Sequence, residues 1–230
     1  MSDKYAMKLL ITTVLLLGLA APARAIDKAA LDKRIRTITT KFDTMQAKPD
    51  KRIPAENLRK AKGIIFLDRT KAGFLFAFEG GGGLAMVKDA KSGAWSPPAF
   101  MRANEASLGF QIGGQQSFVV ILLMNTNATR ALTDSSFKFG GEASGTAGNA
   151  SGKAEGTVSD VDQQLMLVYS DTVGLYGGAA VKGGDLSPDT EANVAYYGEY
   201  LTPTEILMGN KAKPSASATG LAEKITQFSM

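Results

Sequence analysis

Glycine is concentrated in one part of this 230-residue chain. Of the 24 glycines that follow residue 25, 22 lie between Gly63 and Gly198, where they alternate with short runs of β-branched, aromatic and other apolar residues. Such short, closely spaced runs are typical of an antiparallel sheet rather than of alternating strands and helices. The predicted strands lie in residues 63–68, 72–78, 83–89, 106–114, 117–124, 137–143, 164–171 and 173–183.

Paired glycines follow an aromatic residue at four places in this region. The aromatic residues are Phe78, Phe110, Phe139 and Tyr176. Glycine inside a strand marks a bend, a bulge or a close approach of backbone, and several such positions let a sheet curl tightly. We therefore expect an α+β fold built on a strongly curved, largely antiparallel, glycine-rich sheet, or on a small barrel-like sheet.

The segment before this region is predicted to be helical. Apolar residues recur at three- and four-residue spacing along residues 26–48, and basic residues lie on the opposite face. Two interpretations remain open, because periodicity does not separate them: the apolar stripe packs on the domain, or it faces lipid. The stripe consists of Leu31, Ile35, Ile38, Phe42 and Met45.

Further short helices are predicted on both sides of the strands. A second N-terminal helix lies within residues 53–63, and one interrupts the strands within residues 127–135. Near the C-terminus we expect a helix with Ser187 as its N-cap, one that begins around Thr202, and a last helix from Leu221 to Phe228 that follows a polar link.

The first 25 residues have the pattern of a secretory signal peptide. A basic start is followed by the apolar run "LLITTVLLLGLA" and by Ala23-Arg24-Ala25, a small-x-small cleavage motif. We expect residues 1–25 to be removed, 26–50 to form the basic amphipathic helix, and 51–230 to form the main domain with its short C-terminal helix. The protein is then exported, periplasmic or secreted, and peripherally associated with membrane.

The composition excludes the commonest catalytic and metal-binding chemistry. The chain contains no cysteine and no histidine, which removes Ser-His-Asp and Cys-His catalysis and His-ligated zinc. Gly80 to Gly83 resemble part of a dinucleotide signature, but Gly93, Pro97 and Pro98 prevent the helix that would hold a pyrophosphate. We expect no enzyme activity, no cofactor and no metal.

Charge is divided unevenly along the chain. Residues 26–62 hold 11 Lys and Arg against 5 Asp and Glu, whereas residues 63–230 hold 12 against 16. Because the excess of positive charge is confined to one N-terminal segment, we expect an anionic surface as partner. No nucleic-acid partner is expected.

Four stretches of the sequence resemble the SYLF domain in order and spacing. They are "IPAENLRKAKGIIFL", "KAGFLFAFEGGGGLAMVKD…GAWSPPAFM", "ASLGFQIGGQQSFVVILLMN" and "LSPDTEANVAYYG", and the similarity runs from about Ile53 to about Gly209. The resemblance implies a lipid-binding module without catalysis, in which an N-terminal amphipathic or basic segment contributes to membrane binding. Eukaryotic members bind phosphoinositides, and some bind actin.

Three hypotheses of function follow. The leading one is an exported lipid-binding protein that associates with anionic phospholipid head groups through its basic segment. The second is an envelope structural or protein-interaction module without direct lipid binding, and the third is a hydrolase that uses two carboxylates in a cleft. The residues predicted to contact lipid are Lys28, Lys33, Arg34, Arg36, Lys51, Arg52, Arg59 and Lys60.

Overall fold

A single antiparallel sheet forms the centre of the protein. The computed structural model describes residues 26–69, 82–103, 117–134, 137–139, 166–171, 174–175 and 184–230. The strands, each antiparallel to its neighbours, are β1 (Gly63–Arg69), β2 (Gly82–Val87), β3 (Ala99–Ala103), β4 (Ser117–Leu123), β5 (Phe137–Phe139), β6 (Met166–Ser170), β7 (Gly174–Leu175) and β8 (Gly184–Pro188).

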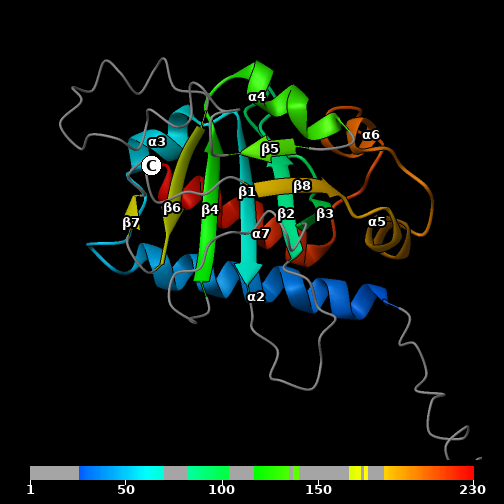
Figure 1. The fold of residues 1–230 in the computed structure, drawn as a ribbon, viewed down its shortest axis with the longest axis horizontal. Coiled ribbons are helices and arrows are strands. Elements are labelled where there is room, and N and C mark those ends of the chain that lie inside the picture. The colour runs from blue at the N-terminus through cyan, green and yellow to red at the C-terminus, as the bar shows by residue number, and fades with distance from the viewer. Residues whose placement is uncertain are drawn as a thin grey trace, which may run out of the picture.

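The eight strands lie in the order β5-β8-β3-β2-β1-β4-β6-β7. Within the described residues the sheet is open, because β5 and β7 each have a neighbour on one side only. The sheet is nevertheless strongly curved, and β5 and β8 run across the direction of β1 and β4 (Figure 1). The predicted α+β fold with a curved antiparallel sheet is confirmed, in its open form rather than as a barrel.

Both faces of the sheet are covered, which explains the continuous apolar runs of the central strands. Alternate residues of β1 and β4, such as Phe66 and Val120, belong to one hydrophobic cluster. Their neighbours Leu67 and Ile121 belong to a second cluster on the opposite face. A strand buried on both faces has no solvent side, so apolar residues follow one another without alternation.

Helices from both ends of the chain cover the first face. They are α2 (Lys28–Gln46), α3 (Ala55–Lys60), α5 (Thr190–Tyr197) and α7 (Ala216–Phe228). α2 and α7 contact each other, α3 contacts α7, and α5 contacts α2 and β3. Figure 1 shows α2 crossing the sheet close to the end of β1, with α7 behind the strands.

The apolar stripe of α2 is buried in this layer. All five of its members are at most 3% exposed and belong to the same cluster as the sheet residues. Phe42 packs edge-on against Phe66 of β1 and Phe228 of α7, with ring centroids 5.3 and 5.5 Å apart. Of the two interpretations of the stripe, the structure supports packing on the domain.

Shorter helices cover the second face. They are α4 (Thr126–Arg130), the 3₁₀ turn η2 (Ala131–Thr133) and α6 (Pro203–Leu207). α6 begins with a capping box, in which the Thr202 side chain accepts from the Glu205 amide and the Glu205 carboxylate accepts from the Thr202 amide. Its buried Ile206 and Leu207 then pack against the second hydrophobic cluster.

Two of the four consecutive glycines are explained by close contacts. A Cβ atom at Gly82 would lie 1.2 Å from Nη2 of Arg34, and one at Gly83 would lie 2.7 Å from the Leu67 side chain. Both glycines are strand residues that pair with β1, opposite Asp68 and Leu67. The glycine run was expected to form a turn or sharp bend between two strands; this is wrong for Gly82 and Gly83, which lie within β2, while Gly80 and Gly81 lie outside the described residues.

Some boundaries near the C-terminus differ from those predicted. Ser187 lies in β8, and the N-cap of α5 is Asp189, whose side chain accepts from the Ala192 amide. α7 begins at Ala216 behind the N-cap Ser215, so residues predicted as a polar link belong to the helix. β3 and β8 were not predicted, and the predicted strands 72–78 and 106–114 lie outside the described residues.

Candidate functional site

The eight residues predicted to contact lipid do not form one cluster. Lys28, Lys33 and Arg36 are exposed on α2, Arg52 is exposed in the connection between α2 and α3, and Arg59 is exposed on α3. The Lys28 ammonium lies 5.6 Å from the centre of the Tyr196 ring. The exposed cations are therefore spread along the whole segment from Lys28 to Lys60.

Arg34 differs from the others because it lies on the flank of α2 that faces the sheet. Its guanidinium is 5.8 Å from the centre of the Phe100 ring and occupies the space that glycine leaves open at position 82. The side chain is therefore part of the packing between α2 and the β2–β3 region. Its predicted role in lipid binding stays a prediction.

Two of the remaining cations are paired with neighbouring carboxylates. Lys51 Nζ lies 3.2 Å from Asp50, and Lys60 Nζ lies 3.1 Å from Glu56 one helical turn away. Surface pairs of this kind contribute about 0 to 1 kcal/mol and exchange partners readily. The segment between α2 and α3 is held in place by the buried Gln46 side chain, which accepts a hydrogen bond from the Ile53 amide at 2.7 Å.

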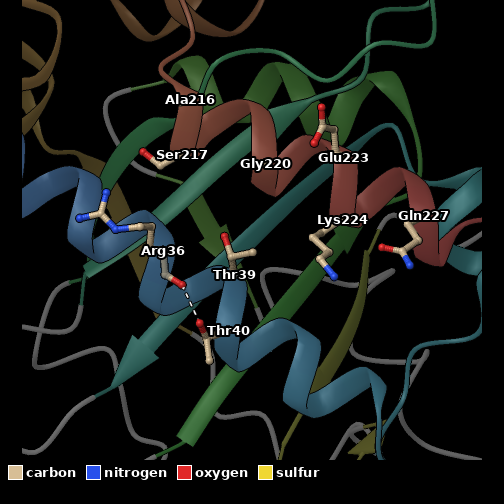
Figure 2. Close-up of a pocket in the computed structure, with 9 residues that line it drawn as sticks. All are labelled: Arg36, Thr39, Thr40, Ala216, Ser217, Gly220, Glu223, Lys224 and Gln227. Carbon is tan, nitrogen blue, oxygen red and sulfur yellow. Dashed lines mark hydrogen bonds between the residues drawn. The ribbon is translucent and has the colours of Figure 1, made fainter.

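A groove of about 630 Å³ runs between α2 and α7, open to solvent (Figure 2). Small and polar side chains line it from both helices: Arg36, Thr39, Thr40, Ala216, Ser217, Gly220, Glu223, Lys224 and Gln227. The two threonine hydroxyls donate to carbonyls of their own helix, Ile35 and Arg36. A Cβ atom at Gly220 would meet nothing within 4 Å, so this position keeps the groove wide.

A hydrogen-bond network joins three helices at one end of the groove. Oδ1 of Asp32 in α2 accepts from Ser217 Oγ, from Ser215 Oγ at 2.9 Å and from Tyr196 Oη at 3.3 Å. Burial alone would raise the pKa of the Asp32 carboxyl, but these donated hydrogen bonds outweigh it and lower the pKa below its ordinary value. Asp32 is thus an anionic anchor between helices, unsuited to donate a proton.

Acidic side chains at the groove and at α5 bear on the hydrolase hypothesis. Glu223 is the one carboxylate among the residues that line the groove. Asp189 caps α5 and pairs with Arg102 at 3.2 Å, which gives it a structural role. The described part of the chain also holds no group of three or more acidic side chains placed to bind a metal. No helix there is long and apolar enough to cross a membrane.

The described part of the chain thus combines an open antiparallel sheet, helical layers on both faces, exposed cations and a groove between α2 and α7. The sequence profile of the Ysc84 family, described as "Las17-binding protein actin regulator", matches residues 104–228, and the chain belongs to this family. The resemblance to the SYLF domain, the domain of this family, is thereby confirmed.

Several curated relatives are similar over most of this chain. SH3 domain-containing YSC84-like protein 1 of Homo sapiens is 32% identical over 181 residues, which cover 78% of this chain and 52% of the human protein. Protein YSC84 of Saccharomyces cerevisiae is 31% identical over 171 residues, covering 73% and 36%. LAS seventeen-binding protein 3 of the same species is 31% identical over 170 residues, covering 73% and 37%.

The chain thus spans about half the length of the YSC84-like relatives that it matches, and little more than a third of the yeast proteins. The names of these relatives are those of binding and regulatory proteins, not of enzymes.

Sequence reasoning missed the groove and its anchor. Thr39, Ser217 and Lys224 carry no local signal, because they meet only when α2 and α7 pack together from opposite ends of the chain. Asp32 was visible only as one acidic residue in a basic helix.

Proposed function

We propose that this protein is an exported, non-enzymatic lipid-binding protein that associates with anionic phospholipid head groups through its basic segment, residues 26–62. The observation that carries the proposal is the combination of exposed cations, such as Lys33 and Arg59, with a fully buried apolar stripe on the same segment. Because the stripe packs on the sheet, the association is electrostatic and peripheral and inserts no helix into the bilayer.

The strength of such binding follows from the number of cations engaged. Each Lys or Arg near an anionic surface contributes about 1 kcal/mol. Four or five engaged cations give a binding free energy that is measurable and sensitive to salt. The proposed setting is the periplasm or the exterior of the cell, which rests on the signal-peptide pattern of residues 1–25.

Co-sedimentation with lipid vesicles tests the proposal. We expect the protein, purified after export, to sediment with vesicles of phosphatidylglycerol and phosphatidylcholine and to remain in solution with phosphatidylcholine alone. Reversal of Lys33, Arg36, Arg59 and Lys60 to Glu should abolish sedimentation. A control with Arg130→Glu and Lys213→Glu, two exposed cations outside the segment, should retain most of it. Undiminished binding of the fourfold variant would refute the assignment of these residues.

A second function, binding of an envelope protein partner, is favoured by the family description and the relatives' names. The groove between α2 and α7 is the candidate surface for it. A photo-crosslinking residue in place of Thr40, which lines the groove, should then give one discrete adduct in intact cells. The same residue in place of the exposed Lys213 should give none. Equal labelling at both positions would contradict a specific protein partner at the groove.

A further inference from the structure

The single tryptophan lies in a basic corner of the domain. Trp95 is half-buried against the first hydrophobic cluster and forms an antiparallel bridge with Lys88, just after the end of β2. The Lys88 ammonium is 4.9 Å from the centre of the Trp95 ring. An indole with one side on the core and one side open, next to a cation, combines an apolar body with a polar rim.

Two further cations, Arg59 and Lys62, lie near Trp95 because Lys88 bonds their backbone carbonyls. Its Nζ donates to the carbonyls of Arg59, at 3.0 Å, and Leu58, at 3.4 Å, at the end of α3. Its backbone amide donates to the carbonyl of Lys62 at 2.8 Å. The side chains of Arg59 and Lys62 are exposed. We refer to Arg59, Lys62, Lys88 and Trp95 as the Trp95 surface.

The three cations of this surface form no ion pair with any residue that the structure describes. The nearby Asp89 carboxylate is engaged in its own turn, where it accepts from the Ser92 amide at 2.7 Å and the Ser92 hydroxyl at 2.8 Å. Burial, and secondly the charge of Lys62, lower the pKa of Lys88, as expected where cations crowd without a counter-charge.

We propose that the Trp95 surface is the part of the domain that contacts the anionic lipid surface, with the indole at the level of the head groups and the exposed cations Arg59 and Lys62 towards the lipid phosphates. Tryptophan is enriched at membrane–water interfaces because it is amphipathic, and juxtamembrane Lys and Arg are attracted to anionic head groups. The inference rests on the proposed lipid binding and deepens it by fixing which part of the basic segment faces the membrane.

This surface is separate from the exposed cations of α2. Lys41 of α2 pairs with Asp68 near the end of β1, whereas Lys62 directly precedes the start of β1. A strand of seven residues spans roughly 20 Å, so the two sets of cations lie towards opposite ends of β1. Figure 1 shows the same arrangement, with α3 towards one end of β1 and α2 crossing near the other.

Because Trp95 is the only tryptophan, its fluorescence reports on this surface without mutation. With vesicles of phosphatidylglycerol and phosphatidylcholine we expect its emission to shift to shorter wavelength and lipids brominated in the acyl chain to quench it. Acrylamide should quench it less than in solution. If the protein co-sediments while emission and acrylamide quenching stay unchanged, the Trp95 surface is refuted and lipid binding stands. Absence of co-sedimentation refutes both.

Matched variants separate the two ends of the basic segment. Arg59→Gln with Lys62→Gln removes two exposed cations from the Trp95 surface, and Lys33→Gln with Arg36→Gln removes two from α2. The first pair should weaken vesicle partitioning roughly thirty-fold, because each cation at the surface contributes roughly a fivefold change. The second pair should weaken it less than threefold. The reverse order would overturn the proposal, and circular dichroism checks that both variants are folded.

Discussion

Replacement of Phe42 by alanine tests whether α2 belongs to the core or to the lipid-facing surface. Phe42 is fully buried and makes edge-to-face contacts with Phe66 and Phe228. A buried Phe→Ala change costs about 3 to 5 kcal/mol, and this one also removes two aromatic pairs worth about 0.5 to 1.5 kcal/mol each. We expect a loss of at least 3 kcal/mol in the free energy of unfolding, measured by urea denaturation.

Two further variants make this result interpretable. Thr40 lies on the outward face of the same helix, where its hydroxyl donates to the Arg36 carbonyl. Thr40→Ala should change the free energy of unfolding by less than about 0.5 kcal/mol. Phe42→Leu replaces Phe42→Ala if that variant does not fold. It keeps an apolar side chain but loses both ring contacts, and should lower the free energy of unfolding by about 1 to 2 kcal/mol. A stable Phe42→Ala protein with weakened vesicle binding would refute the buried stripe and favour a lipid-facing one.

Three other predictions concern glycine positions and acid stability. Gly82→Ala should destabilise the protein because its Cβ would overlap the Arg34 guanidinium, and Arg34→Ala should reduce that penalty in a double-mutant cycle; additive losses would contradict the contact. Gly220→Ala should raise the unfolding free energy by about 1 kcal/mol, since the new methyl group meets open space in a helix; a loss of stability would show that the groove needs the glycine. The hydrogen bond from Lys211, with those from Thr202, lowers the pKa of Glu205 from 4.5 to about 2. Because the pKa is lower in the folded state, the Glu205 carboxylate contributes stability that is present above pH 4.5 and is lost as pH falls towards 2. Glu205→Gln should therefore make the free energy of unfolding depend less on pH in that window.

Local patterns predicted the elements whose residues interact mainly with near neighbours. The spacing of Leu31, Ile35 and Phe42 predicted the helix α2 and its apolar face, although not that this face is buried, and Thr202 followed by Pro203 marked the start of α6. β1, β4 and β6 were recognisable because each is a continuous apolar run.

Other features depend on contacts that are distant in sequence. β8 is five residues long and ends at Pro188, which pairs with Met101 of β3, so its strand character comes from its partner. Proline at a strand end lacks the donor of a ladder hydrogen bond, which argued for a helix start instead.

The candidate site shows the same limit. Helical periodicity does not reveal that Arg34 turns towards the sheet, because this requires glycine at position 82 on another element. Charge counting found the basic segment, but Lys88 and Trp95 lie beyond it, and Lys88 reaches the Arg59 carbonyl only because of its place at the end of β2. The contacts of these charged side chains therefore could be identified only from the three-dimensional structure.

We propose that charge, and not insertion of α2, holds this protein at a lipid surface. Vesicle co-sedimentation of the unmodified protein over a range of salt concentrations tests it most directly. The screening length falls from about 10 Å at 0.1 M to about 3 Å at 1 M salt. We predict binding to phosphatidylglycerol-containing vesicles at low salt that is lost as salt rises. Binding that persists at high salt, or that is equal on neutral vesicles, would contradict the claim.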